Sequence, residues 1–267
     1  TAYDAGVDRI LQFGGVTPAD VRDLVYGAMF TRGGKDLKNS AVFIGGSDVS
    51  VGEAMLKATK KSFFGPVSVS VMLDSNGCNT TAAAAVAKIL SVCDVSGKKI
   101  AVLSGTGPVG LRAAAMLAQE GALVTLTSRK LERAAAACES IKERFGINVS
   151  PAAAADAGEN ADVLEGAYGA MCFGAAGVML IPEAVWTGHA TLKVLADVNA
   201  VPPTGIEGIK PTWDGKEKHG KIIFGAIGIG GLKMKIHRAS VAKLFEQNDT
   251  VLEAEEIFAT AKKEIGK

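Results

Sequence analysis

The sequence contains few of the residues that build metal sites and disulfide frameworks. Its 267 residues include four cysteines and three histidines. The cysteines lack C-x-x-C spacing and the histidines do not cluster, which argues against a structural zinc site and a disulfide scaffold. Unpaired cysteines are typical of a reducing compartment, so we expect a cytoplasmic protein without a bound metal. The residues concerned are Cys78, Cys93, Cys138, Cys172, His189, His219 and His237.

The sequence also lacks an excess of charge and a long apolar run. Lysine plus arginine (29) nearly balances aspartate plus glutamate (28), so we expect neither a nucleic acid nor an acidic membrane as partner. No run approaches the ~20 apolar residues of a membrane-spanning helix. Hydrophobic residues make up 48% and charged residues 21%, a balance typical of globular proteins. The length predicts one large or two modest domains.

Short apolar runs alternate with alanine-rich stretches of helical length. The apolar residues within each run are continuous, which is typical of strands buried on both faces of a parallel sheet. Strands that alternate with helices of 10–15 residues indicate βαβ units. We therefore predict an α/β protein. The predicted strands are 41–44, 67–73, 100–103, 123–126, 170–173, 192–198 and 222–224.

A change in composition near residue 95 predicts a domain boundary. We expect one α/β domain at 1–95 and a second domain, with a parallel sheet, at 96–231. The last two predicted helices have no strand after them. They are expected to return to the first domain as residues 232–267, so that the two domains flank a cleft.

A glycine motif follows the predicted strand at 100–103. Gly105-Thr106-Gly107-Pro108-Val109-Gly110 fits G-x-G-x-x-G and leads directly into an alanine-rich helix. In this context the first glycine permits a tight turn, the second lets the backbone approach a pyrophosphate, and the third lets helix and strand pack closely. The helix N-terminus supplies free N–H groups and a positive dipole end. We therefore predict a Rossmann-type dinucleotide domain.

The end of the next strand indicates which dinucleotide binds. Domains that prefer NAD usually place a carboxylate there, bonded to the ribose 2′-hydroxyl. Here the strand ends in Ser128, Arg129 and Lys130, whose hydroxyl and cationic groups suit a 2′-phosphate. This favours NADP. The alternative is that Arg129 and Lys130 only begin the following helix.

Three further residues follow predicted strands and complete the expected cofactor site. Ala175 lies in a loop of small residues, Asn199 opens a rigid Asn-Ala-Val-Pro-Pro loop, and Gly228 lies in a glycine cluster. Ligands of open α/β sheets bind outside the carboxyl ends of the strands, so we predict all three near the cofactor. The alternative, for each residue taken singly, is that it only forms a short loop and has no contact with a cofactor.

A polar loop follows the strand predicted at 67–73 and is the candidate substrate site. Its eight small or polar residues include Asp74, Asn76, Asn79 and Thr80, which could read a heterocycle with several N–H and C=O groups. The alternative is a helix cap with an Asx turn. In that case Asp74 and Asn79 would stabilise the local backbone and would not contact a substrate.

Lys233 and His237 are four residues apart in a predicted helix, and hence on one face. The helix starts in a glycine cluster, so this face is expected near the cofactor. The alternative is that His237 is an ordinary surface or core residue. No Ser–His–acid or Cys–His set can be assembled. Hydride transfer that leaves a resonance-stabilised cation requires positioning and no general acid or base.

Several strings of the sequence are long and uncommon. In these strings the chain resembles the methylene-tetrahydromethanopterin dehydrogenases of methylotrophic bacteria, and the resemblance covers essentially the whole chain. It is closest to the NADP-dependent type, which also accepts methylene-tetrahydrofolate. The strings are Thr31–Lys35, Phe43–Gly46, Phe63–Pro66, Met72–Gly77, Gly105–Gly110, Ser128–Lys130, Asn199–Pro203 and Phe224–Ala239.

The resemblance implies a two-domain subunit that transfers a hydride from a methylene-pterin to NADP⁺, giving a methenyl-pterin and NADPH. It implies a homotrimer in which a neighbouring subunit completes the cleft. It also implies that Thr81, Lys233 and His237 match active-site positions near the pterin and its methylene bridge.

One departure from related enzymes predicts the absence of a second activity. Folate dehydrogenase–cyclohydrolases share a Tyr-x-x-x-Lys pair whose lysine serves hydrolysis. Here none of the three tyrosines is followed by lysine at the fourth position, so we predict dehydrogenation without methenyl hydrolysis. The pairs are Tyr3 with Val7, Tyr26 with Phe30, and Tyr168 with Cys172.

Two other functions remain compatible with these patterns. One is a dehydrogenase of another small substrate, such as a shikimate-type hydroxy acid, which would need a base beside a hydroxyl. The other is an NADPH-sensing module without chemistry, which would have little use for the polar loop that begins at Asp74.

Overall fold

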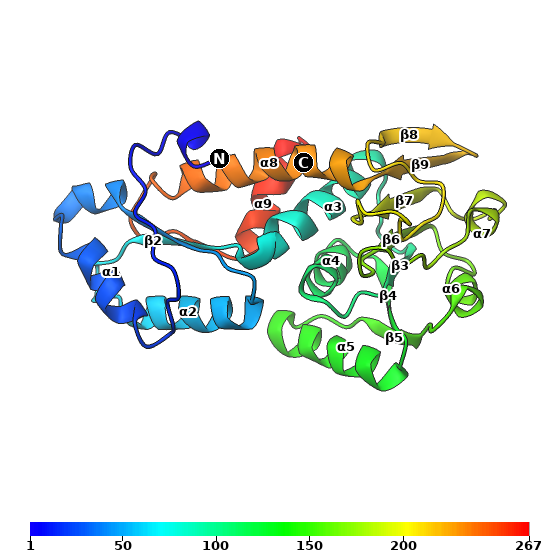
Figure 1. The fold of residues 1–267 in the computed structure, drawn as a ribbon, viewed down its shortest axis with the longest axis horizontal. Coiled ribbons are helices and arrows are strands. Elements are labelled where there is room, and N and C mark those ends of the chain that lie inside the picture. The colour runs from blue at the N-terminus through cyan, green and yellow to red at the C-terminus, as the bar shows by residue number, and fades with distance from the viewer. Residues whose placement is uncertain (267) are drawn as a thin grey trace. The chain divides into compact units, whose positions relative to one another are not determined.

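The chain forms two compact units in the computed structural model, which describes residues 1–266 (Figure 1). Unit 1 comprises Thr1–Thr80 and Met234–Lys267, and unit 2 comprises Thr81–Lys233. Both boundaries fall inside helices, α3 (Cys78–Val92) and α8 (Ala226–Lys243). The composition of the sequence places the first boundary later, near residue 95. In the structure the division falls earlier, after Thr80, and α3 runs through it, so no loop in the sequence marks this boundary.

Unit 1 contains a three-stranded parallel sheet in the order β1-β2-β10. The central strand is buried at all four positions, as its continuous apolar run predicts. The sequence did not indicate β10, because two residues form no recognisable run. The strands are β1 (Ala41–Ile44), β2 (Ser70–Leu73) and β10 (Val251–Leu252). The helices confined to this unit are α1 (Val21–Met29), α2 (Val49–Lys61) and α9 (Ala254–Glu264), with 3-10 turns at Tyr3–Ala5, Gly34–Asn39 and Ser75–Gly77.

Serine and asparagine side chains attach the C-terminal segment to β2. The Ser70 hydroxyl donates to the Gln247 carbonyl at 2.7 Å and accepts from the Thr250 amide at 3.2 Å. The Asn248 side chain donates to the Ser68 carbonyl at 3.1 Å. The segment after α8 is therefore fixed along β2, and β10 pairs with β2 there.

Unit 2 contains a seven-stranded sheet in the order β5-β4-β3-β6-β7-β9-β8. With β3 counted as the first strand and the antiparallel edge strand β8 left out of the count, the other six follow the 3-2-1-4-5-6 order of the Rossmann fold. Only β8 runs antiparallel to its neighbour within this described sheet. The strands are β3 (Lys99–Leu103), β4 (Leu123–Ser128), β5 (Ser150–Ala153), β6 (Gly169–Cys172), β7 (Val194–Asp197), β8 (Asp214–Lys218) and β9 (Lys221–Phe224).

Helices cover both faces of this sheet. Figure 1 shows α4 and α5 on one side, with α6 and α7 on the other. These helices are α4 (Pro108–Gln119), α5 (Leu131–Phe145), α6 (Ala157–Val163) and α7 (Glu183–Thr187). The α/β class and the Rossmann-type sheet that the sequence predicts are thus confirmed. No helix in residues 1–266 is long and apolar enough to cross a membrane.

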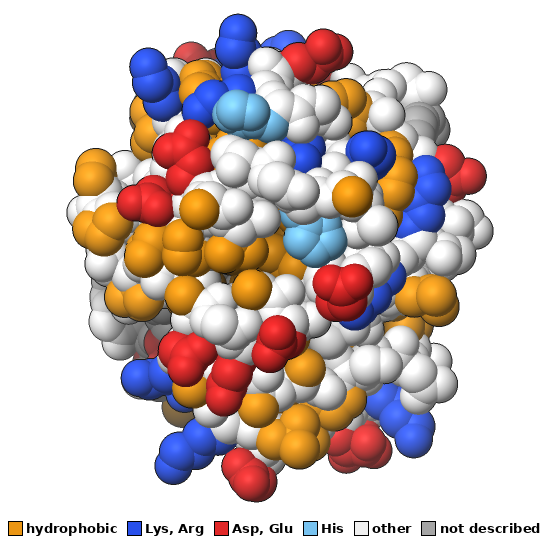
Figure 2. Space-filling view, turned by 90° about the vertical axis from the view of Figure 1, so that its right-hand side faces the viewer, with side chains coloured by type: hydrophobic (Ala, Val, Ile, Leu, Met, Phe, Trp, Pro, Cys, Tyr) orange, Lys and Arg blue, Asp and Glu red, His pale blue; other side chains and the backbone are white. Residues whose placement is uncertain are grey.

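The sequence failed to indicate the two edge strands, β5 and β8. Most residues of both strands are exposed, and β8 reads Asp-Gly-Lys-Glu-Lys without an apolar run. Figure 2 shows the face of the molecule on which β8 and α7 lie, where cationic and anionic side chains are interspersed with hydrophobic ones. This mixture fits the near-neutral net charge of the chain.

The turn between β3 and α4 depends on a close approach of two backbone segments. A Cβ atom on Gly110 would lie 2.5 Å from the Cα atom of Gly105. A Cβ atom on Gly107 would meet no atom within 4 Å. The third glycine of the motif is therefore required by packing, whereas the second leaves a space beside the turn.

We expect Gly110→Ala to lower the free energy of unfolding by about 1–3 kcal/mol, because the added methyl group must displace backbone atoms of Gly105. Gly107→Ala is the matched control. The φ of Gly107 is −81°, which alanine adopts freely, so its stability should stay within about 0.5 kcal/mol of the wild type. Urea unfolding followed by circular dichroism measures both. Equal losses in the two variants would contradict this reading of the turn.

Candidate functional site

The predicted cofactor residues of unit 2 follow the carboxyl ends of its parallel strands. Gly105–Gly110 follows β3, and Ser128 ends β4. Ala175 follows β6, Asn199 follows β7, and Gly228 follows β9. Because parallel strands end at the same edge of a sheet, these segments share one edge of unit 2. Ligands of doubly wound sheets bind at this edge.

The glycine turn presents backbone N–H groups that have no partner within residues 1–266, beside open space. The Gly105 amide donates to the Thr127 carbonyl at 3.1 Å, which fastens the turn to β4. Gly107 is the N-cap residue of α4 and Pro108 is its first residue, and no side chain in the described structure caps this helix. The first-turn N–H groups are therefore free to bind an anion. Thr106 and Val109, which flank this cap, are half-buried.

Two unpaired cations lie at the end of β4. Ser128 is buried, whereas Arg129 and Lys130 are exposed. Lys130 occupies the N-cap position of α5, and its side chain does not cap the helix. Neither cation has an ion-pair partner within residues 1–266. Both side chains can therefore meet a phosphate without breaking an existing contact.

A buried carboxylate organises the loop after β7. Asp197 accepts from the amides of Asn199 at 2.9 Å and Ile206 at 2.8 Å, so it holds both ends of the loop. The Asn199 side chain donates to the Ala175 carbonyl at 3.3 Å and accepts from the Val201 amide. Burial raises the pKa of Asp197 above its usual range, although these amide bonds oppose the shift.

Asp197 was not among the predicted site residues, although its position in the sequence carried a signal. A carboxylate at the carboxyl end of a strand whose four residues are all buried needs several hydrogen-bond donors. The following loop supplies them as backbone amides. Asp197 therefore shapes the segment that brings Asn199 and Ala175 into contact.

Packing accounts for the glycine at position 228. Gly228 lies in the first turn of α8, and a Cβ atom there would collide with the Trp213 carbonyl oxygen. The close approach of this helix to the segment before β8 thus explains the missing side chain without reference to a ligand.

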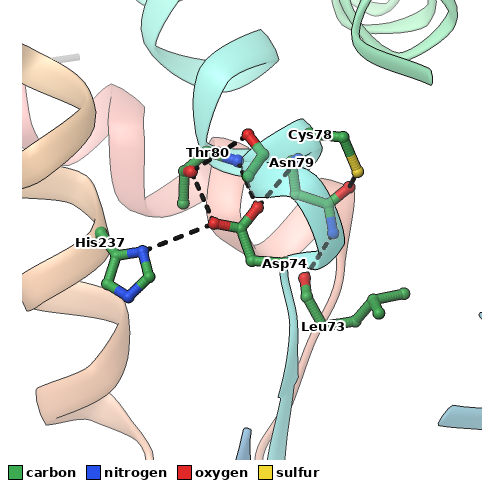
Figure 3. Close-up of polar contacts among 7 residues, drawn as sticks. Leu73, Asp74, Cys78, Asn79, Thr80 and His237 are labelled. Carbon is green, nitrogen blue, oxygen red and sulfur yellow. Dashed lines mark hydrogen bonds and ion pairs between the residues drawn. The ribbon is translucent and has the colours of Figure 1, made fainter. Parts of the chain in front are cut away.

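The polar loop after β2 forms a buried network around Asp74 (Figure 3). One oxygen of Asp74, Oδ1, accepts from the amides of Asn79 and Thr80 at 3.0 Å each. The other, Oδ2, accepts from the Thr80 hydroxyl at 2.6 Å. These donors belong to the first turn of α3, so Asp74 caps that helix from outside it.

His237 of α8 meets this carboxylate. Its Nδ1 atom lies 3.5 Å from Oδ2 of Asp74, and its ring lies 5.6 Å from the ring of Phe43 at an angle of 50°. Burial by itself raises the pKa of Asp74. The hydrogen bonds from His237 and Thr80 outweigh burial, and the pKa lies below its usual value.

The four candidate substrate residues differ in exposure. Asn76 is exposed and has a φ of 52°. Asp74, Asn79 and Thr80 are buried, and the Asn79 side chain donates to the Leu73 carbonyl at 2.6 Å. The polar atoms of these three side chains form hydrogen bonds within unit 1. The cap and turn alternative therefore explains why Asp74 and Asn79 are polar, and in the structure Thr80 joins the same network.

The remaining predicted residues lie on the two long helices. Thr81 follows Thr80 in α3 and is half-buried. Lys233 is half-buried and precedes His237 by about one turn of α8, so the two share a face, as their spacing predicts. Phe43 of β1 is 49% exposed and was not among the predicted site residues, because an aromatic residue in an apolar strand run does not differ from a core residue in the sequence.

Within the described residues, no group of three or more His, Cys, Asp or Glu side chains could hold a metal ion. The arrangement offers an anion site at the sheet edge of unit 2 and a histidine set against a carboxylate in unit 1. Such features are suited to binding an anion and to orienting a polar ligand.

Comparison with known proteins identifies relatives. Residues 1–76 match the family model described as methylene-tetrahydromethanopterin dehydrogenase, N-terminal. The chain is 51% identical over 262 residues to the bifunctional protein MdtA of Methylorubrum extorquens, covering 97% of this chain and 91% of that protein. It is 32% identical over 269 residues to the NAD(P)-dependent methylenetetrahydromethanopterin dehydrogenase of the same organism, covering 93% and 86%.

Solved structures are more distant. The transhydrogenase of Sinorhizobium meliloti is 18% identical, with a TM-score of 0.47, and the match covers 78% of this chain and 66% of that chain. The two Methylorubrum relatives are decisive, since each exceeds 30% identity over most of its length. The chain belongs to the methylene-tetrahydromethanopterin dehydrogenase family.

Proposed function

We propose that the protein is an NADP-dependent methylene-tetrahydromethanopterin dehydrogenase that also oxidises methylene-tetrahydrofolate. One relative is named as an NAD(P)-dependent dehydrogenase of the first substrate, and the other is named as bifunctional. The observation that carries the proposal is the open backbone turn at Gly107, at the ligand-binding edge of a Rossmann sheet. Such a turn fits the phosphates of a dinucleotide.

Residues of unit 2 would hold the cofactor. Gly105–Gly110, including Thr106, Pro108 and Val109, would surround the pyrophosphate, because Gly107 leaves room there and α4 supplies free amides. Arg129 and Lys130, with Ser128 beside them, would bind the 2′-phosphate. Asn199 and Ala175, which are joined by a hydrogen bond, would border the nicotinamide. The bound cofactor supplies the hydride acceptor.

Residues of α3 and α8 would orient the pterin. Thr81 would donate a hydrogen bond to the pterin or its bridge, and Lys233 and His237 would position the ring from one helix face. A cation beside the developing methenyl cation would oppose the reaction. Lys233 is therefore assigned to heteroatoms of the ring, offset from the methylene carbon.

The reaction requires no proton transfer. The C–H bond of the methylene carbon breaks, its electron pair leaves as hydride, and the adjacent nitrogens delocalise the resulting positive charge. The protein contributes orientation, which can supply several kcal/mol of the barrier reduction. Because the chain lacks a Tyr-x-x-x-Lys pair, we infer that the methenyl product is released without hydrolysis.

A homotrimer is part of the proposal. The resemblance to the family supplies the number of subunits. Large apolar side chains exposed on unit 1 fit a surface covered by a neighbour. Examples are Tyr3, Leu11, Phe13, Phe30 and Phe64.

Purified protein mixed with NADP⁺ and methylene-tetrahydromethanopterin should produce NADPH, measured by absorbance at the reduced-nicotinamide band. Methylene-tetrahydrofolate should also react, and added methenyl-pterin should persist. Shikimate in place of the pterin is the negative control. NADPH binding without turnover would indicate a sensor, and oxidation of shikimate would indicate the rival dehydrogenase. Rapid loss of methenyl-pterin would overturn the assignment of a dehydrogenase without hydrolase activity.

Gly107→Ala should weaken NADP⁺ binding by about tenfold or more, because the new methyl group fills the space assigned to the pyrophosphate. Isothermal titration calorimetry measures the Kd. Gly27→Ala is the matched control, since a Cβ atom at this α1 position also meets no atom within 4 Å. An unchanged Kd in Gly107→Ala would place the dinucleotide elsewhere.

Arg129→Asp should raise KM for NADP⁺ by about 10- to 100-fold and alter KM for NAD⁺ far less. The variant replaces a charge-assisted bond to the 2′-phosphate by repulsion, and NAD lacks that group. Arg133→Asp, an equal charge change on the exposed surface of α5, is the control. Equal effects on both cofactors would remove Arg129 from the 2′-phosphate site.

A further inference from the structure

The two ring nitrogens of His237 have different surroundings. Nδ1 faces the Asp74 carboxylate at 3.5 Å. Nε2 points away from it (Figure 3) and has no hydrogen-bond partner in the described part of the chain. The His237 side chain is 20% exposed, whereas that of Asp74 is 1% exposed. A ligand could therefore reach the histidine while the carboxylate stays covered.

Three donors other than His237 also stabilise the charged form of Asp74. Two amides from the first turn of α3 and the Thr80 hydroxyl donate to its oxygens at 2.6–3.0 Å. The positive end of the α3 dipole adds to this stabilisation. Oδ2 therefore remains an acceptor directed at Nδ1 even when the His237 ring is neutral.

An acceptor at this position selects one form of the neutral ring. The proton of a neutral imidazole resides on either nitrogen, and a carboxylate facing one nitrogen favours the proton there. The Phe43 ring lies beside the imidazole, with the two ring centroids 5.6 Å apart. Hydrogen bonds of this kind are often long in unliganded enzymes and shorten when the substrate binds.

We propose that Asp74 is a positioning residue that holds His237 as the Nδ1–H tautomer and presents Nε2 as a hydrogen-bond acceptor for an N–H group of the reduced pterin. The role of His237 as a substrate contact rests on the proposed function. The tautomer itself does not. Asp74, which the sequence analysis placed among the substrate-binding residues, acts on the substrate through His237.

The structural alternative is that Asp74 only caps α3. The Asp74→Asn variant separates the two roles, because one end of its amide can still accept from the Asn79 and Thr80 amides. The NH₂ group then replaces Oδ2 and donates to Nδ1, since the Thr80 hydroxyl can turn to accept its second proton. The variant would retain much of the cap and reverse the tautomer, so that Nε2 carries the proton.

Long-range ¹H–¹⁵N NMR of ¹⁵N-histidine-labelled protein reads the tautomer directly. The chain has three histidines, and the signals that disappear in the His237→Gln variant are those of His237. For the neutral ring we expect Nδ1–H on His237 in the wild type and Nε2–H in Asp74→Asn. Thr80→Val removes one bond to the same carboxylate but keeps its charge, so it should lose stability and retain Nδ1–H. Nε2–H in the wild type would overturn the proposal.

Kinetics tests the consequence for catalysis. Asp74→Asn should lower kcat with methylene-pterin by about 10²-fold, because Nε2 of His237 would carry a proton and could no longer accept from the pterin. KM for NADP⁺ should be unchanged. Combining Asp74→Asn with His237→Gln should cost no more than His237→Gln alone, because the aspartate acts through the histidine. Additive losses, or an unchanged kcat, would contradict this role. If the wild type makes no NADPH, the proposed function fails while the NMR result still decides the tautomer.

Discussion

Parallel strand pairing is the constraint on which both units depend. A parallel strand is reached only by a crossover, so each strand is followed by a turn at one edge of the sheet and then usually by a helix. In unit 1 this places Asp74 between β2 and α3, and in unit 2 it places the glycine motif between β3 and α4. Both candidate sites are therefore built from the carboxyl end of a strand and the N-terminus of a helix.

The two buried carboxylates show how the surroundings of such a position determine its chemistry. Asp74 receives a hydroxyl, two helix amides and a histidine, and its pKa lies below the usual value. Asp197 receives only backbone amides, so burial dominates and its pKa is raised. The first carboxylate can direct a neighbouring ring, whereas the second organises the loop that contains Asn199.

The glycine motif combines two physical requirements within six residues. Gly110 must lack a side chain because its backbone approaches that of Gly105, and this holds with or without a ligand. Gly107 has no such neighbour, and its missing side chain leaves room beside the amides of α4. Stability and cofactor affinity can therefore be changed separately at neighbouring positions of one turn.

The sequence by itself determined the α/β class, the buried central strands, the glycine turn and the shared face of Lys233 and His237, because periodicity and local spacing carry that information. It did not indicate β5, β8 or β10, which are exposed or too short to form an apolar run. Only the tertiary structure decided that Asp74 points inward to α3 and His237, with Phe43 against the ring. Phe43, Asp74 and His237 lie far apart in the chain, and packing alone brings them together.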